Sequence, residues 1–289
     1  MEKLISVVGL TSSGKSDLGI ALALEFNGEI VSADSRQVYK GLDWCSGKVT
    51  KEEQEQVVHH LLDVALLGER FTLFDYQAAA YEKIDDIISR GKTPFLVGGT
   101  GLYTRSVVQG FNLVEEKPNK NEREMYEKLD KNELIMLCKK KGIDIPAEVT
   151  ARRLVRILEK NGEENENSPR YKVLQIGIKW EREEIYNRIK IRLERRMPNM
   201  IEEIKNLLES GVDAEFLRSL GLEAKYVVDY LDGKFENYTV FFEELFKEER
   251  HFAKRQNTWF NKEQDTVWLD ANDDLIPNAI KLVREFLAE

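Results

Sequence analysis

Short apolar runs and longer amphipathic stretches alternate through the first hundred residues. The runs at 4–8, 29–33 and 94–97 are almost continuously apolar, which is typical of strands buried on both faces of a parallel sheet. Apolar residues recur at i, i+3 and i+4 between positions 74 and 88, and the stretch 16–26 is rich in Leu, Ile and Ala, so both stretches predict helices. This alternation predicts a parallel sheet covered by helices on both faces.

The pattern changes near residue 111. A polar, proline-containing stretch at 115–121 precedes charged segments without a strand signal, and a second polar stretch at 163–169 closes this region. We expect three helices here, at 121–129, 131–141 and 146–160. The chain is therefore predicted to form a core domain of residues 1–114 and 171–289, interrupted by a helical insertion of residues 115–170.

After the insertion the chain returns to the sheet and then becomes mainly helical. Apolar residues alternate at 172–179, which predicts a strand, and a second strand is expected at 266–269. Pro198 and Gly211 are expected to end helices, because proline blocks a helix interior and glycine favours a helix end. We expect helices at 181–197, 199–209, 222–231, 240–260 and 274–288.

The loop between the first strand and the first helix carries a phosphate-binding pattern. It matches G-x-x-x-x-G-K-[ST] in the required strand-to-helix context, with residues Gly9, Leu10, Thr11, Ser12, Ser13, Gly14, Lys15 and Ser16. Backbone N–H groups of such a loop surround one anion, the lysine adds a positive charge and the serine hydroxyl ligates Mg²⁺. We therefore expect an α/β fold, with a P-loop NTPase-like parallel sheet core and a mostly helical insertion domain. The motif leaves open which phosphorylated molecule binds and which bond breaks.

A carboxylate stands at the end of a different strand from the one expected in a phosphoryl-transfer enzyme. Such enzymes usually have an apolar strand that ends in Asp, a second Mg²⁺ anchor, but the strand at 94–97 ends in Gly-Gly-Thr-Gly. Asp34 instead follows the second strand, at the sheet edge where α/β proteins bind ligands. It is either a general base toward a nucleophile, with diphosphate held as a leaving group, or a helix cap or Mg²⁺ ligand. The residues alone weight these readings equally.

Charge is unevenly distributed along the 289 residues. The net charge of −9 argues against a nucleic-acid binder, yet residues 139–196 hold 16 Lys and Arg against 10 Asp and Glu. This region either forms a local basic surface that binds phosphates or consists of solvated helix faces with ion pairs. Charge alone does not decide between the two.

The remaining composition predicts a soluble, cytoplasmic protein. No apolar run approaches the roughly 20 residues that span a bilayer, and the apolar segment near the N-terminus is too short for a signal peptide. Cys45 and Cys138 lie far apart, without the spacing of a disulfide framework or a zinc site. The adjacent His59 and His60 do not face one ion from a helix or strand, so a packing or loop role is expected for them.

Five blocks of sequence follow one another in a recognisable order from about residue 4 to residue 270. Two of them, Asp-Ser-x-Gln-x-Tyr and Ala-Lys-Arg-Gln-x-Thr-Trp-Phe, are far more specific than the phosphate loop. The blocks occupy residues 9–16, 31–43, 59–63, 97–103 and 252–260. Together they resemble the tRNA dimethylallyltransferase family, the tRNA isopentenyltransferases, over nearly the whole chain.

The resemblance implies transfer of the dimethylallyl group of dimethylallyl diphosphate to N6 of the adenosine at tRNA position 37, next to the anticodon. Asp34 then takes the proton of the amine while the C–N bond forms. Thr100, the phosphate loop and Mg²⁺ at Ser16 stabilise the departing diphosphate. An arginine from the segment 181–188 also faces the diphosphate, and both Arg182 and Arg188 fit this position.

The resemblance also implies contacts with the anticodon stem-loop of tRNA. A base must leave its stack and enter a pocket where its edges are read, and hydrogen-bonding groups suited to adenine adjoin Asp34. The alternative for Arg152 and Arg156 is a solvated helix face. The residues expected to contact tRNA are Asp34, Ser35, Arg36, Gln37, Thr100, Arg123, Arg152, Arg153, Leu154, Val155 and Arg156.

Two other classes are weighed against this prediction. A small-molecule or nucleotide kinase would also have the phosphate loop. The absence of the strand-end Asp and the presence of the late Arg-Gln-x-Thr-Trp-Phe block count against a kinase. A nucleic-acid-binding P-loop protein without catalysis does not account for Asp34 and Thr100. We therefore expect a monomeric, Mg²⁺-dependent prenyltransferase whose partners are tRNA and dimethylallyl diphosphate and which binds no membrane.

Overall fold

The computed structural model describes residues 1–113, 120–147, 149–162, 167–263 and 265–289. The chain separates into two compact units. The core unit comprises Met1–Gly110 and Pro169–Glu289, and the insertion unit comprises Phe111–Ser168. Among the described helices, none combines the length and apolar character needed to cross a membrane.

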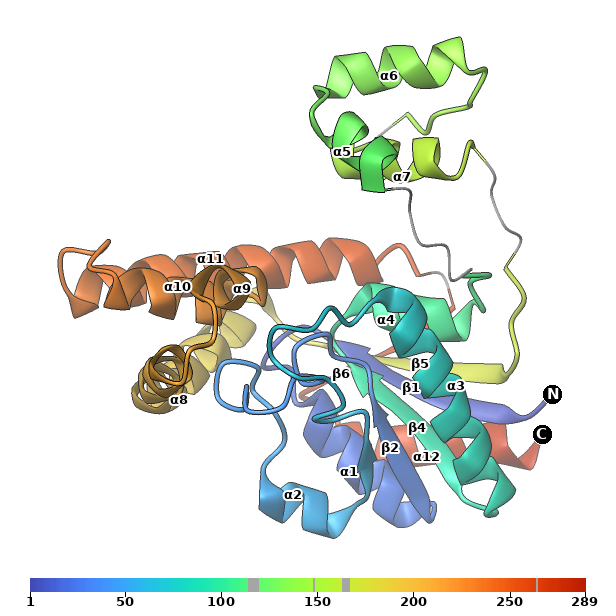
Figure 1. The fold of residues 1–289 in the computed structure, drawn as a ribbon. Coiled ribbons are helices and arrows are strands. Elements are labelled where there is room, and N and C mark those ends of the chain that lie inside the picture. The colour runs from blue at the N-terminus through green and yellow to red at the C-terminus, as the bar shows by residue number, and fades with distance from the viewer. Residues whose placement is uncertain (114–119, 148, 163–166, 264) are drawn as a thin grey trace. The chain divides into compact units, whose positions relative to one another are not determined.

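The core unit is built on one sheet whose strands are all parallel (Figure 1). Its order is β3-β2-β4-β1-β5-β6, so each neighbouring pair requires a crossover that places helices on the faces. The sequence pattern predicted every strand except the short β3. The strands are β1 (Lys3–Gly9), β2 (Gly28–Ser32), β3 (His59–His60), β4 (Thr93–Gly98), β5 (Lys172–Lys179) and β6 (Thr266–Asp270).

Helices cover both faces of this sheet and extend beyond its carboxyl edge (Figure 1). The short helices α2, α4 and α9 were not predicted by the sequence pattern, whereas the long ones were. The helices of the core unit are α1 (Lys15–Glu25), α2 (Lys51–Gln56), α3 (Leu73–Ser89), α4 (Gly101–Val108), α8 (Arg182–Glu209), α9 (Ala214–Ser219), α10 (Leu222–Leu231), α11 (Tyr238–Phe260) and α12 (Leu275–Ala288).

Successive strand residues point into two hydrophobic clusters, one on each face of the sheet. Ile5 and Phe95 belong to the cluster that includes residues of α1 and α12, whereas Leu4 and Leu96 belong to the cluster that includes residues of α3 and α4. All four side chains are fully buried. Because both faces are covered, the strands carry continuous apolar runs instead of an alternating pattern. The predicted α/β core is confirmed.

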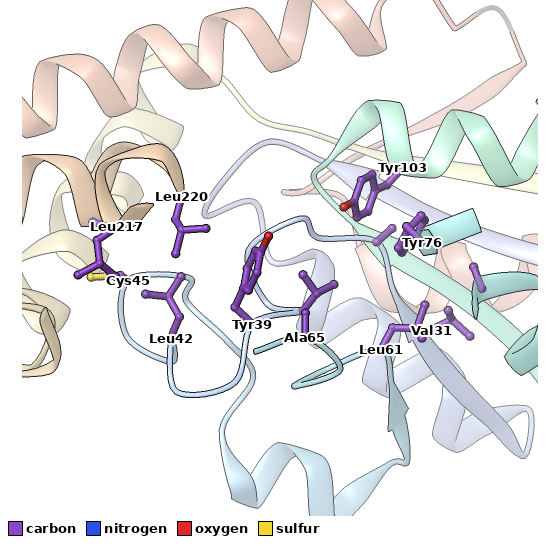
Figure 2. Packing of buried hydrophobic residues seen from close by; sticks show 14 of the residues in the cluster. Val31, Tyr39, Leu42, Cys45, Leu61, Ala65, Tyr76, Tyr103, Leu217 and Leu220 are labelled. Carbon is purple, nitrogen blue, oxygen red and sulfur yellow. The ribbon is translucent and has the colours of Figure 1, made fainter. Parts of the chain in front are cut away.

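The segment that follows Asp34 is anchored by apolar packing. Leu42 and Cys45 lie in the same buried cluster as Leu217 and Leu220, on α9 and just after it (Figure 2). Fully burying one aliphatic side chain of this size contributes about 1.5–3 kcal/mol. The chain between β2 and α2 is therefore fixed against the helices, although it contains no regular element of its own.

Pro198 does not end the helix that contains it. α8 runs unbroken through this residue, so the expected boundary between 181–197 and 199–209 is wrong. A proline in a helix interior costs about 3 kcal/mol. Met197, Met200 and Ile204 are fully buried on the same helix, and their packing offsets that cost.

The insertion unit is a small helical unit with its own core. Leu134 and Leu154 are buried in that core with Cys138. The Thr150 hydroxyl accepts a hydrogen bond from the Arg153 backbone N–H at 3.3 Å, as a helix cap does. α7 therefore begins at residue 151, five residues later than expected. The helices are α5 (Lys120–Glu127), α6 (Lys131–Lys140) and α7 (Ala151–Glu159).

Candidate functional site

The phosphate loop joins β1 to α1 at the carboxyl edge of the sheet. Ser12 and Gly14 have positive φ angles of 61° and 86°, which turn the chain tightly before α1 begins at Lys15. The first N–H groups of a helix have no partners within the helix. They are thus available to an anion at this end of α1, as the sequence motif predicts.

The ammonium group of Lys15, the positive charge of this loop, is partly removed from solvent. Its Nζ donates to the Leu10 carbonyl oxygen at 3.2 Å. The pKa of Lys15 is lowered to about 8, chiefly by burial of the ammonium group and secondly by the positive charge of Arg192, while Asp34 partly opposes both effects. A bound polyanion would reverse this shift because it stabilises the charged form.

Of the two candidate arginines, Arg188 contacts the phosphate loop. Its Nε donates to the Ser12 carbonyl oxygen at 2.9 Å, and its guanidinium lies over the Trp180 ring, 4.4 Å from the centroid. The Trp180 indole N–H in turn donates to the Ser13 carbonyl oxygen at 2.9 Å. Arg182 is exposed and contacts Tyr186 on its own helix. This geometry favours Arg188 as the diphosphate-facing residue.

Arg192, which sequence reasoning missed, lies one helical turn further along α8. Its guanidinium donates to the Thr11 hydroxyl at 3.1 Å and to the Gly47 carbonyl oxygen at 3.4 Å. Burial, followed by the charge of Arg196, lowers the pKa of Arg192 to about 10. The i, i+4, i+8 spacing of Arg188, Arg192 and Arg196 on one helix face was a signal that could have identified it.

Gln256 of α11 ties the phosphate loop to the segment after β4. Its side-chain oxygen accepts from the Thr11 backbone N–H at 2.8 Å, and its side-chain nitrogen donates to the Gly99 carbonyl oxygen at 3.0 Å. The side chain is buried. The glutamine of the late Arg-Gln-x-Thr-Trp-Phe block, to which no role was assigned from sequence, thus joins two loops of the site.

The Asp34 carboxylate is held by backbone groups of its own turn. Its Oδ1 accepts from the N–H groups of Arg36 at 2.9 Å and of Gln37 at 3.4 Å. Within the described residues, Oδ2 has no hydrogen-bond donor. Capping thus occupies one carboxylate oxygen of a residue that lines the main cavity and leaves the other without a hydrogen bond, so capping and catalysis do not exclude each other.

Thr100 adjoins Asp34 because the ends of β2 and β4 lie very close together. The Thr100 hydroxyl accepts from the Ser35 backbone N–H at 3.1 Å, and the Thr100 N–H donates to the Ala33 carbonyl oxygen at 3.2 Å. A Cβ atom on Gly98 would lie 2.1 Å from that same carbonyl oxygen. Only glycine permits this approach, which brings the threonine hydroxyl to the turn that contains Asp34.

Gln37 is oriented by two hydrogen bonds. Its side-chain nitrogen donates to the Gly47 carbonyl oxygen at 3.2 Å, and its side-chain oxygen accepts from the Ser32 hydroxyl at 3.1 Å. Gly47 thus accepts from both Gln37 and Arg192. This carbonyl connects the two sides of the site.

These groups surround one cavity of about 650 Å³ in the core unit. Polar groups of the phosphate loop and of the turn after β2 line one part of it, apolar side chains from α4 and α11 line another, and several cations complete the wall. The lining includes Thr11, Lys15, Ser16, Asp34, Ser35, Arg36, Gln37, Gly47, Thr100, Leu102, Arg192, Lys225, Phe252, Arg255, Gln256 and Trp259.

The insertion unit carries the remaining residues expected to contact tRNA. Leu154 and Val155 are buried in its core, because α7 turns its apolar face inward, so the expectation of tRNA contact does not hold for their side chains. Arg123 and Arg156 form ion pairs with Glu159 at 3.6 and 3.1 Å.

The first turn of α7 carries two further arginines, Arg152 and Arg153, and both are exposed to solvent. Of the four arginines of the insertion unit that are expected to contact tRNA, these two are available without breaking a described ion pair. No ion pair involves either of them among the described residues. The structure therefore keeps both the basic-surface and the solvated-face interpretations of α7 open, as the sequence did.

The paired histidines have structural partners. His60 Nε2 lies 2.7 Å from a Glu29 carboxylate oxygen, and His59 Nδ1 lies 2.8 Å from the Val57 carbonyl oxygen. No cluster of three or more His, Cys, Asp or Glu side chains suited to a metal occurs in the part of the chain that the structure describes.

Comparison with known proteins gives one consistent answer. The profile of the family described as IPP transferase matches residues 37–263. A tRNA dimethylallyltransferase of Streptococcus equi subsp. equi is 40% identical over 299 residues, with 100% of this chain and 99% of that protein covered. The tRNA dimethylallyltransferase 2 of Citrifermentans bemidjiense is 37% identical, with 97% and 94% covered.

Solved structures of similar proteins agree with this. The tRNA isopentenylpyrophosphate transferase of Bacillus halodurans has a TM-score of 0.76 at 34% identity, with 100% of this chain and 96% of that chain covered. A eukaryotic dimethylallyltransferase acting on tRNA has a TM-score of 0.82 at 25% identity, with 100% and 80% covered.

Proposed function

The chain belongs to the IPP transferase family of tRNA dimethylallyltransferases, and from this membership we propose how its cavity carries out the reaction. The predicted enzyme class, a prenyltransferase that modifies tRNA, is confirmed by the comparisons, which do not support the alternative kinase. The proposed donor is dimethylallyl diphosphate. The proposed acceptor is N6 of the adenosine at tRNA position 37, next to the anticodon.

The diphosphate of the donor occupies the phosphate loop. The N–H groups at the start of α1, the Lys15 ammonium and the Arg188 guanidinium converge on this place, so they stabilise negative charge as it develops on the leaving group. The nearby Arg192 adds a further positive charge. Such stabilisation is greatest in a cavity that excludes water.

Ser16 fits a magnesium ion bound together with the diphosphate. It lines the cavity beside Lys15, and Mg²⁺ typically binds few protein groups together with substrate phosphate oxygens and water. The protein would hold the ion through the Ser16 hydroxyl. When bound, Mg²⁺ neutralises charge on the diphosphate.

The acceptor amine lies between Asp34 and Thr100. Delocalisation into the ring makes the exocyclic amine of adenine a poor nucleophile, so removal of its proton assists attack. As the bond from N6 to C1 of the dimethylallyl group forms, the bond from C1 to the diphosphate oxygen breaks. The amine proton passes to Asp34 and the electron pair of the broken bond leaves with the diphosphate.

The tRNA contacts follow from the same geometry. Ser35 and Gln37 present hydrogen-bonding groups beside Asp34 that suit the edge of a flipped adenine. Arg36, Lys225 and Arg255 line the cavity and suit the phosphates around that nucleotide. On the insertion unit, the exposed α7 arginines suit the backbone of the anticodon stem-loop.

One observation carries this proposal: a single cavity holds both an anion-binding loop and an oriented carboxylate with a free oxygen. The test is to incubate the protein with Mg²⁺, dimethylallyl diphosphate and unmodified tRNA that has adenosine at position 37. We expect prenylation of this adenosine, detected as N6-(dimethylallyl)adenosine by mass spectrometry of digested tRNA. A tRNA with guanosine at that position is the matched control, because guanine carries a carbonyl oxygen at C6 where adenine carries the amine.

The Asp34→Asn variant tests the base. Asparagine retains an oxygen for the N–H groups of Arg36 and Gln37, so the fold of the turn is retained while the base is lost. We expect turnover to fall by roughly 10²- to 10⁴-fold, with tRNA affinity near that of the wild type. An equal loss of tRNA affinity contradicts the base assignment.

No prenylated product, together with ATP-dependent phosphorylation of a nucleotide, contradicts the whole proposal. A monomeric state and a cytoplasmic location stay predictions from the sequence.

A further inference from the structure

Three large apolar side chains are exposed inside the cavity. Leu102 is 43% exposed, Phe252 37% and Trp259 36%. Phe252 and Trp259 are seven residues apart on α11 and therefore share one helix face, and Gln256, which contacts the phosphate loop, lies between them. An exposed apolar surface of this kind inside a polar cavity indicates a hydrophobic part of a ligand.

The Trp259 indole is fixed in place on two sides. A Cβ atom on Gly101 would lie 2.2 Å from its Nε1, so the indole edge packs directly on the backbone at the start of α4. The Arg105 guanidinium lies over the ring, 4.6 Å from the centroid, and forms an ion pair with Glu263. Gln109 also donates to Glu263, at 3.4 Å. The ring is therefore a rigid wall.

A second, small cavity of about 10 Å³ lies behind this wall. Gly101, Trp259 and Phe260 line both cavities, so they separate them. Thr104 lines the small cavity, and its hydroxyl is buried without a hydrogen-bond partner. The small cavity has room for about one water molecule. The volume behind the indole is thus incompletely filled.

We propose that Trp259 determines the length of prenyl chain that the enzyme accepts. This inference rests on the proposed function and adds the specificity of its donor site. Gly99 lies beside the Lys15 side chain and Gly101 beside Trp259, with Thr100 between them. A donor with its diphosphate at the phosphate loop and its reacting carbon near Thr100 therefore directs its apolar tail toward the indole.

The length limit follows from this arrangement. A dimethylallyl tail ends against the indole, and a donor with one more isoprene unit collides with it. Removing the indole joins its volume to the cavity behind it, and one isoprene unit is smaller than an indole ring. The same bonds form and break with the longer donor, since only the tail differs.

The test compares two donors, dimethylallyl diphosphate and its longer homologue geranyl diphosphate, on the same tRNA. We expect the ratio of kcat/KM for geranyl over dimethylallyl transfer to rise by about tenfold or more in Trp259→Ala, since pocket contacts of this size discriminate by 10- to 200-fold. Trp259→Phe is expected to lie between the two. Trp44→Ala is the matched control: Trp44 is 45% exposed and does not line the cavity, so its ratio is expected to be unchanged.

An unchanged ratio in Trp259→Ala overturns the proposal. So does a rise in KM for tRNA alone, because that result assigns the indole to stacking on a base. If Trp259→Ala fails to fold, Gly101→Ala replaces it: the added methyl group pushes the indole into the cavity, and we expect KM for dimethylallyl diphosphate to rise. An unchanged donor KM in a folded Gly101→Ala protein also overturns it. Wild-type prenylation with the shorter donor tests the proposed function separately.

Discussion

We expect the affinity for the prenyl donor to depend on pH, because the pKa of Lys15 is shifted. In the free protein this pKa is about 8, chiefly because the ammonium group is desolvated. A bound diphosphate raises the pKa, so binding takes up a proton and weakens as the pH rises through 8. The fraction of protein with charged Lys15 falls from about nine-tenths at pH 7 to about one-tenth at pH 9. We therefore expect the affinity to fall by about tenfold over this interval.

Calorimetric titration with inorganic diphosphate at constant Mg²⁺ and ionic strength measures this directly. Lys15→Met is the control, and we expect weaker binding that changes with pH only through the ionisation of the diphosphate itself, which both proteins share. Arg192, with a pKa of about 10, contributes only above this interval. A wild-type affinity that is constant from pH 7 to 9, or the same decline in Lys15→Met, refutes the reasoning.

Three further outcomes are expected. Gln256→Leu leaves the buried Thr11 N–H and Gly99 carbonyl unpaired, at about 1–3 kcal/mol each, so its thermal midpoint falls by several degrees and its KM for the donor rises. Glu29→Gln removes a buried carboxylate paired with Arg90, Lys92 and His60, and Arg90 is the main reason that the pKa of this carboxylate lies well below its usual range. We expect urea unfolding at pH 7 to show that the free energy of unfolding falls by about 1–3 kcal/mol. The difference from wild type shrinks as the pH falls below about 4, where the wild-type carboxylate begins to lose its advantage. Arg152→Ala combined with Arg153→Ala weakens tRNA binding and reduces its salt dependence, and an unchanged salt slope assigns these residues to a solvated face.

Features that depend on local sequence were predictable. The phosphate loop and its strand and helix follow from one short motif. The helix expected from the apolar spacing at 74–88 is α3, where the Thr72 hydroxyl caps the N-terminus by accepting from the Asp75 N–H at 3.2 Å. Asp34 was identified because it follows a strand in a parallel sheet. Its divided role, one oxygen capping and the other free, required coordinates.

Features that depend on packing between distant elements were not predictable. Arg192 and Gln256 reach the phosphate loop from helices more than 170 residues further along the chain, and no local pattern encodes such contacts. Pro198 was misjudged for the same reason, since the burial of Met197 and Met200 outweighs its local helix-breaking tendency. The resemblance to a family identified the reaction but not the contacts that Arg192 and Gln256 make with the phosphate loop.

The close approach at Gly98 has a consequence for engineering. The separation of the Asp34 carboxylate, the proposed base, from the Thr100 hydroxyl is set by two strand ends that meet where a side chain is missing. Changing the polar residues of the site alters its chemistry but leaves this spacing intact, whereas a single methyl group at position 98 forces the strands apart. Directed evolution toward new acceptors should therefore vary the residues that line the cavity and keep Gly98 unchanged.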